Sequence, residues 1–267
     1  PTLPVPRHPI MKKYITINPR YAHSNISILA RATVEQGIPD ASVVVYRGRN
    51  VLAKLENAGL MIKSYKRPRL AKGLVYHWLR KPKCRRAFSN GMRLREMGIR
   101  TPEPFFAVEI YNRYGALANS FYACELLKGW KEMRGVQNNP DFDAIARAFA
   151  AFIFSMHIKG VFMSDLTPGN VLFRTGEDGY EFALVDINRM TFDCNSWKEL
   201  SKNFRALLDT EDATATVAAY YAAILKKNDI ELPAADFESY ARKIYSAHQH
   251  KLISRRRFKN MFSRKKK

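Results

Sequence analysis

A short segment, FMSDLTPGNVLF at residues 162–173, constrains the fold of this chain most, because it places polar side chains between apolar runs. Before it, apolar residues of the segment 140–160 recur at spacings of three and four, which predicts a long amphipathic helix. After it, the runs NVLFR and FALVDI flank the turn TGEDGY and predict a β-hairpin. We therefore expect Asp165 and Asn170 on a loop between helix and strand, and Asp186 at the end of the hairpin.

These three side chains suit phosphoryl transfer, which requires aligned atoms and neutralised charge more than covalent help from the protein. Mg²⁺ prefers hard oxygen ligands, so Asp186 and Asn170 are predicted to hold it. Asp165 is then placed to accept the proton of an attacking hydroxyl as a general base. The alternative is an ordinary surface turn, since Asp, Thr, Pro, Gly and Asn are all common turn residues.

The surrounding pattern predicts an α+β protein with two lobes. Residues 42–66 contain three short β-rich runs and residues 105–127 contain two more, with a basic helix at 83–98 between them. This order predicts a five-stranded antiparallel sheet with one helix, followed by a mainly helical lobe. The expected divisions are an N-terminal extension and lead-in at 1–41, a sheet lobe at 42–128, a helical lobe at 129–250 and a basic tail at 251–267.

The run LMIKSYK offers a cation for nucleotide phosphates. Leu60 and Ile62 alternate with Met61, which places Lys63 at the end of an apolar strand. Lys66, on the same run, is the alternative cation. The competing interpretation is that Lys63 is a surface residue at a strand edge.

The net charge of +21 is concentrated in two blocks, residues 63–95 and 251–267, which contain 12 and 9 Lys/Arg and no acidic residue. Such blocks predict an anionic partner. The second block interleaves its charges with Phe258, Met261 and Phe262, which favours reversible attachment to an anionic membrane over a solvated, disordered tail. Nucleic acid is disfavoured, because no recognised nucleic-acid motif is present. Arginine pairs bidentately with phosphate and carboxylate groups, so the anionic partner is expected to contact the first block at Lys66, Arg67, Arg69, Lys72, Arg85 and Arg86.

The remaining composition predicts a cytoplasmic protein. No apolar run is long enough to span a membrane, and no signal-peptide pattern precedes MKKYITINPRY, where Met11 resembles a natural start. Residues 1–10 are accordingly expected to be an extension. Cys84, Cys124 and Cys194 are odd in number and widely spread, which predicts reduced thiols. The six histidines form no metal-ligand pattern.

Several motifs together resemble the protein-kinase-like superfamily: the strand that ends in Lys63, the basic helix that ends in GIRTPEP, the ELL at 125–127, SDLTPGNVLF and ALVDINR. Within it they are similar to the lipopolysaccharide core kinases of Gram-negative bacteria, which phosphorylate Kdo or heptose of the inner core. The resemblance covers residues 42–225, and GIRTPEP and VDINRM are its most specific parts.

The resemblance implies an ATP- and Mg²⁺-dependent sugar kinase that transfers a phosphoryl group in line to a hydroxyl of a lipid-linked core oligosaccharide. It also implies a peripheral location on the cytoplasmic face of the inner membrane. It assigns Asp165 as the catalytic-loop aspartate and Lys63 as the phosphate-binding lysine. Asn170 and Asp186 become the magnesium ligands, and the backbone from Glu125 to Leu127 becomes the hinge that holds adenine.

The chain also departs from the superfamily pattern. Met163 replaces the usual histidine of the catalytic loop, and RGRN, with only Gly48, is a weak counterpart of the Gly-rich loop. The basic helix has no acid to pair with Lys63: Ser89 or Asn90 stands at the expected place and Glu96 comes about two turns later. Two alternatives therefore stay open, a catalytically weak pseudokinase that acts as a membrane scaffold and an RNA-associated atypical kinase.

Overall fold

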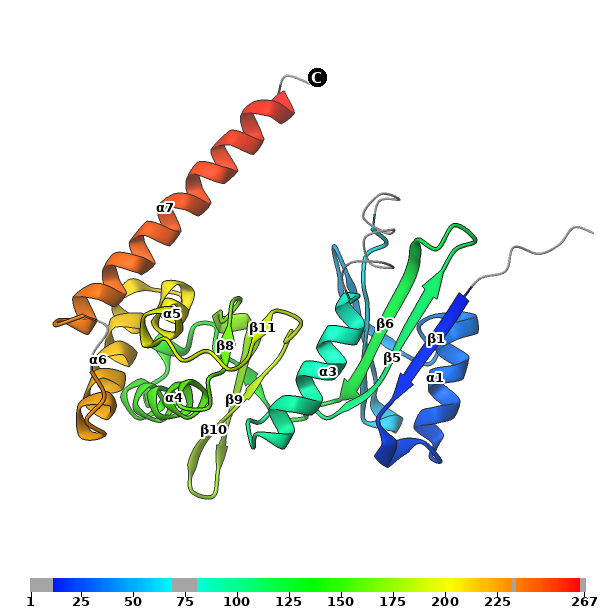
Figure 1. Cartoon of the computed structure of the whole chain (residues 1–267), viewed down its shortest axis with the longest axis horizontal. Coiled ribbons are helices and arrows are strands. Elements are labelled where there is room, and N and C mark those ends of the chain that lie inside the picture. Colours follow the sequence, from blue (N-terminus) through cyan, green and yellow to red (C-terminus); the bar gives the residue numbers. More distant parts are fainter. Residues whose placement is uncertain (1–11, 69–80, 232–233, 265–267) are drawn as a thin grey trace, which may run out of the picture. The chain divides into compact units, whose positions relative to one another are not determined.

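The structure is a computed structural model that describes residues 12–68, 81–231 and 234–264. The chain divides into two compact units, Pro1–Lys128 with Asp186–Asn188, and Gly129–Val185 with Arg189–Lys267 (Figure 1). Within the described ranges, no helix is both long enough and apolar enough to cross a membrane.

The first unit is built on one antiparallel sheet of six strands in the order β1-β5-β6-β4-β3-β2. Among the described residues of this unit, two helices and two short 3-10 turns, η1 (Pro19–Tyr21) and η2 (Glu56–Ala58), accompany the sheet. The strands and helices are β1 (Lys12–Ile17), α1 (Asn25–Gln36), β2 (Val43–Arg47), β3 (Val51–Leu55), β4 (Leu60–Ser64), α3 (Lys83–Glu96), β5 (Pro104–Tyr111) and β6 (Leu117–Glu125).

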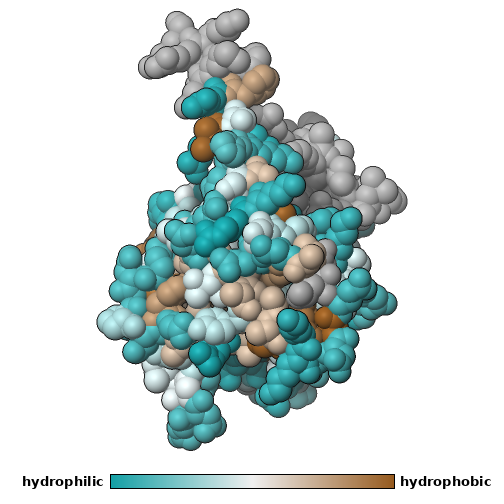
Figure 2. All heavy atoms as spheres, turned by 90° about the vertical axis from the view of Figure 1, so that its left-hand side faces the viewer, coloured by the Kyte–Doolittle hydropathy of each residue, from teal (hydrophilic) through white to brown (hydrophobic). Residues whose placement is uncertain are grey.

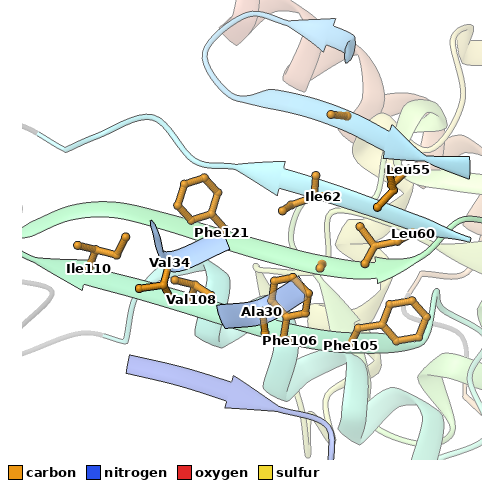
Figure 3. Close-up of a cluster of buried hydrophobic side chains, with 12 residues drawn as sticks. Ala30, Val34, Leu55, Leu60, Ile62, Phe105, Phe106, Val108, Ile110 and Phe121 are labelled. Carbon is orange, nitrogen blue, oxygen red and sulfur yellow. The ribbon is translucent and has the colours of Figure 1, made fainter. Parts of the chain in front are cut away.

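Helices cover both faces of this sheet. On one face Phe106 and Val108 of β5 pack against Ala30 and Val34 of α1 (Figure 3). On the other face Ala107 contacts the cluster that includes Cys84, Ala87 and Phe88 of α3. Because successive strand residues point to opposite faces, every residue of β5 is buried.

The described part of this unit corrects one expectation from the sequence, since its sheet has six strands rather than five, and two helices rather than one accompany it. The additional strand, β1, pairs with β5 in antiparallel register from Lys12↔Tyr111 to Ile17↔Phe106. β1 lies within residues 1–41, which the sequence predicts to be an extension and lead-in and not part of the sheet. The physical reason for its presence is that β5 would otherwise be an edge strand with unpaired backbone groups.

The second unit combines helices with two small sheets, ordered β10-β9-β7 and β11-β8. The predicted long helix is α4, and the predicted hairpin is β9–β10, in which Phe173 faces Phe182. The elements are β7 (Lys131–Glu132), η3 (Val136–Asn138), α4 (Phe142–His157), β8 (Phe162–Met163), η4 (Pro168–Asn170), β9 (Val171–Gly176), β10 (Gly179–Leu184), β11 (Met190–Thr191), α5 (Trp197–Leu200), η5 (Ser201–Ala206), α6 (Glu211–Lys227) and α7 (Phe237–Arg264).

The last helix continues through most of the region expected to be a separate basic tail. Phe237, Ala241 and Tyr245 are buried in the first turns of α7, where the helix packs on α6 and η5. From Lys251 to Phe258 the side chains are exposed except for Leu252, which is half-buried. The basic residues of this part of the chain therefore lie on an extended helix that projects from the second unit (Figure 1).

Candidate active site

The structure brings Lys63 and Asp186 together. On β4, Leu60 and Ile62 enter the core beneath α1, so the alternation of the strand points Lys63 to the opposite face. There its Nζ lies 2.8 Å from Asp186 Oδ1 and 5.4 Å from the ring centroid of Tyr65. Because only 17% of the lysine side chain is exposed, Lys63 is not the surface residue of the competing interpretation.

Asp186 has a backbone conformation that only a few non-glycine residues adopt, with φ at 53°. Two amides hold the segment in this conformation. Asn188 Nδ2 donates a 2.5 Å hydrogen bond to Asp186 Oδ1, and Asn90 Nδ2 of α3 donates a 2.7 Å bond to the Ile187 carbonyl. Strained residues of this kind persist where their surroundings fix them, and they cluster at functional sites.

Asn90 lies on α3 where an acidic partner of Lys63 is expected, and it contacts the Asp186 segment. Among the described residues, Asp186 is the carboxylate paired with Lys63. Glu96 is exposed near the end of the helix, where it lines a pocket of about 520 Å³ with Arg95 and Glu103. Glu96 therefore does not serve as the ion-pair partner of Lys63, and helix α3 contacts the Asp186 segment through a neutral amide instead.

The second unit positions Asp165 and Asn170. Asn170 Nδ2 donates a 2.8 Å hydrogen bond to the Asp165 carbonyl, which turns the amide oxygen away from that carbonyl. The Asn170 carbonyl in turn accepts the N–H of Val185, the residue before Asp186, at 2.9 Å. One carboxylate oxygen of Asp165, Oδ2, lies 3.3 Å from Arg189 Nη1.

A buried chain of hydrogen bonds supports this loop where Met163 replaces the usual histidine. Asn203 Nδ2 donates to the Met163 carbonyl at 2.6 Å, so its Oδ1 accepts from His157 Nε2 at 3.0 Å. His157 Nδ1 then accepts from the Tyr221 hydroxyl at 2.7 Å. The imidazole is thus a neutral tautomer with both nitrogens satisfied, and burial lowers the pKa of His157 to about 4.

Comparison with known proteins identifies the family of this chain. The model of the lipopolysaccharide kinase (Kdo/WaaP) family matches residues 63–245, which is more than half of the chain. The chain belongs to this family. The family likeness inferred from the motifs is therefore confirmed, and the protein is a kinase that transfers phosphate to an alcohol group.

Two solved structures are similar to this chain. A structure described as WaaP in complex with acyl carrier protein is 16% identical, with a TM-score of 0.53, and the match covers 87% of this chain and 99% of that one. A Rio2 kinase structure from Chaetomium thermophilum, with ADP/Mg²⁺-phosphoaspartate, is 14% identical at a TM-score of 0.45 and covers 83% of this chain and 67% of that one. No curated protein sequence matches the chain. The first of these likenesses shows the kinase-like fold.

The donor set around Asp186 fits the cation that this kinase family generally uses. No group of three His, Cys, Asp or Glu side chains within the described residues forms a metal cluster. A mixed set of carboxylate and amide oxygens suits Mg²⁺, which completes its shell with phosphate and water. Asn188 adds to this fit, because its Oδ1 is buried without a hydrogen-bond partner two residues after Asp186.

The remaining predicted binding residues are those of the expected hinge and of the first basic block. Glu125 ends β6, where its Oε2 accepts the Glu103 N–H at 3.1 Å, and Leu127 is half-buried two residues later. Arg67 is exposed just after β4, whereas Arg69 and Lys72 lie outside the described residues.

Arg85 and Arg86 both lie on α3. Arg85 Nε is 2.5 Å from the buried Glu109 carboxylate, which also accepts the Tyr111 hydroxyl at 2.7 Å. The partner of Arg85 is thus a β5 residue of its own unit. Burial raises the pKa of the Cys84 and Cys124 thiols to about 12, which fits the reduced thiols expected from the sequence.

Three residues that support the site were missed by the sequence interpretation. Arg189 had a visible signal, because it is the only basic residue of VDINRM. Asn90 was noted only as a substitute for a missing acid, and Asn203 carried no signal at all. Asn203 contacts the loop across 40 residues of sequence, a separation that local patterns do not encode.

Proposed function

We propose that this kinase transfers the γ-phosphoryl group of ATP, in line, to a hydroxyl of Kdo or heptose in the inner core of lipopolysaccharide. The observation that carries the proposal is the Lys63–Asp186 ion pair of 2.8 Å in a chain of the Kdo/WaaP family. When nucleotide binds, Lys63 can exchange its carboxylate partner for a phosphate, and Asp186 can exchange its lysine partner for a divalent cation. Family membership supplies the substrate class, while the particular sugar is part of the proposal.

The chain's own groups have distinct roles in this proposal. Lys63 binds the phosphates of ATP, and the backbone from Glu125 to Leu127 binds adenine. Asp165 orients the acceptor hydroxyl and takes its proton, a contribution of roughly 10²- to 10⁴-fold for a positioned general base. Asp186 and Asn170 hold Mg²⁺, which supplies charge neutralisation at the transferring phosphate.

We further propose that the exposed half of α7 attaches the kinase to anionic lipid. Arg255, Arg256 and Arg257 are exposed there beside Ile253 and Phe258, which are 46% and 62% exposed. Figure 2 shows a mainly hydrophilic surface on this face, with single apolar side chains along the helix. Each basic side chain near an anionic surface contributes about 1 kcal/mol, so such a helix supports reversible attachment.

Vesicle sedimentation tests the membrane attachment separately from catalysis. The protein is expected to sediment with vesicles that contain anionic lipid but not with neutral vesicles, and less at high salt. Charge reversal at Arg255, Arg256 and Arg257 should abolish the sedimentation. Equal binding of the wild type and this variant would refute a role for the helix, and preference for RNA over vesicles at matched ionic strength would favour the nucleic-acid alternative.

A phosphate-transfer assay tests the activity. Purified protein with radiolabelled ATP and Mg²⁺ is expected to label a lipid A precursor that carries Kdo, heptose or both, and mass spectrometry of the product locates the phosphate. Asp165→Ala and Asp186→Ala should each abolish labelling while the far-ultraviolet circular dichroism is unchanged. Full activity in either variant would refute its role, whereas nucleotide binding without turnover on any core acceptor would favour the pseudokinase.

A further inference from the structure

The loop that carries Asp165 has no cation of its own. Its six residues, DLTPGN, include no lysine or arginine. Phosphoryl transfer nevertheless spreads negative charge over the three non-bridging oxygens of the moving group, and this charge needs a positioned donor. A cation for this position therefore has to come from another part of the chain.

Among the described residues of the second unit, Arg189 is the one whose guanidinium pairs with the Asp165 carboxylate. Its Nη1 lies 3.3 Å from Asp165 Oδ2. Its backbone is fixed to the same loop, because the Arg189 carbonyl accepts both the Ser164 N–H at 3.1 Å and the Ser164 hydroxyl at 3.2 Å. The next residue, Met190, pairs with Met163 in the β8–β11 ladder. The backbone that carries the arginine is thus fixed to this loop from the Arg189 carbonyl onward.

The Arg189–Asp165 pair is poorly explained as a stabilising ion pair. The two side chains are 48% and 41% exposed, and exposed pairs contribute little to stability because water screens them. The Ser164 and Met163 bonds, which involve only backbone atoms of Arg189 and Met190, hold this corner without the guanidinium. The guanidinium is therefore expected to act on a molecule that binds next to Asp165.

We propose that Arg189 is a catalytic residue that binds the phosphoryl group during its transfer. The proposal rests on the proposed function, and it adds a residue to which no role has been assigned. A guanidinium presents five donors in a planar fork, so Arg189 can keep one N–H on Asp165 and direct others at phosphoryl oxygens. One side chain thereby contacts both the general base and the phosphoryl group.

The step balances with the groups already named. The acceptor hydroxyl oxygen forms a bond to the γ-phosphorus, and the bond from that phosphorus to the β,γ-bridging oxygen breaks. The electron pair of the broken bond stays on ADP, and the hydroxyl proton passes to Asp165. Arg189 stays protonated throughout and donates hydrogen bonds to the non-bridging oxygens, where they are strongest while the charge is spread in the transition state.

The test measures binding of a transition-state mimic, so that it does not depend on which sugar is the acceptor. Isothermal titration with Mg²⁺, ADP and aluminium fluoride reports the affinity for a planar phosphoryl mimic, and titration with ADP and Mg²⁺ alone reports the ground state. Arg189→Ala is expected to weaken binding of the aluminium fluoride complex about 100-fold and to leave ADP binding within about twofold. Arg189→Lys should recover part of the loss.

Arg174 provides a matched control. It lies on β9 in the same unit, is 41% exposed, pairs with Glu181 at 2.8 Å and lies over the Trp130 ring at 4.8 Å. Arg174→Ala should bind both complexes as the wild type does.

Where an acceptor is phosphorylated, kcat of Arg189→Ala should fall by about 10²- to 10³-fold, and added guanidinium should restore part of it. Equal loss of ADP and aluminium fluoride binding, or an unchanged affinity for both, would overturn the role of Arg189. Tight aluminium fluoride binding that needs Arg189, without turnover on any core acceptor, would keep this role and refute the proposed acceptor.

Discussion

Replacing His157 with glutamine should make the stability of this kinase less dependent on pH. His157 is 2% exposed and neutral, and its two ring nitrogens join Tyr221 to Asn203 beneath the catalytic loop. Burial lowers its pKa from 6.5 to about 4, and the Asn203 hydrogen bond opposes only part of this shift. The unfolded chain therefore binds a proton between these two pH values, while the folded chain does not.

The sign and the size of the effect follow from this difference. Because the unfolded state binds more protons below pH 6.5, the free energy of unfolding falls as the pH is lowered. At 1.36 kcal/mol for each pKa unit, the shift from 6.5 to about 4 corresponds to a loss of about 3 kcal/mol by pH 4. Above pH 6.5 the contribution is constant.

Urea unfolding of the wild type and of His157→Gln between pH 7.5 and pH 4 measures the effect. Glutamine is neutral throughout, so the stability advantage of the wild type should shrink by about 3 kcal/mol across this range. Subtraction removes the contribution of all other titrating groups. His250, which is exposed on α7, provides the control, since His250→Gln should change little. A difference between wild type and His157→Gln that is the same at both pH limits would refute the reasoning.

Three further substitutions, with Gly129→Ala as a control for the last, test other parts of the structure. Asn203→Ala removes the buried donor to the catalytic loop and should cost about 1 to 3 kcal/mol in urea unfolding, with a larger loss of kcat than of ATP affinity. Asn90→Asp keeps the side-chain size but removes the donor to the Ile187 carbonyl. It should therefore weaken Mn²⁺ binding to the ADP complex about tenfold. Tighter Mn²⁺ binding would mean that this position favours an acid. In thermal unfolding, Gly160→Ala should destabilise the protein by about 2 kcal/mol, because the φ of Gly160 is 67° and the new Cβ would lie 3.1 Å from a backbone nitrogen. Gly129 has a φ of 78° but open space around it, so Gly129→Ala should cost about 1 kcal/mol in the same assay.

The positions of Asp165 and Asn170 before a hairpin, and of Asp186 after it, were accessible from the sequence because their signals are local. A helix period, a cluster of turn residues and two alternating runs suffice to place a loop before a hairpin, and the structure has α4, η4 and β9–β10 in that order. The chemistry of the loop is equally local, since carboxylates and amides keep their preference for Mg²⁺ in any fold. Family membership could be inferred for the same reason.

The first unit illustrates the limit of such patterns. β1 has exposed or half-exposed side chains along its whole length, so it lacks the buried alternation that marks a strand in a sequence. Its place in the sheet comes from backbone hydrogen bonds to β5, which are independent of side-chain type. The burial of β5 on both faces likewise required α1, a helix with only three buried residues.

The sequence by itself determined the kinase-like order of elements, the position of the candidate catalytic loop and the family, because each depends on residue types at short spacings. Only the tertiary structure decided what holds the reactive groups. Lys63 meets Asp186, Asn90 meets Ile187, and Asn203 joins His157 to the loop across 40 or more residues of sequence. Such contacts are set by how helices and sheets pack within each unit, and packing leaves no periodic signal in the chain.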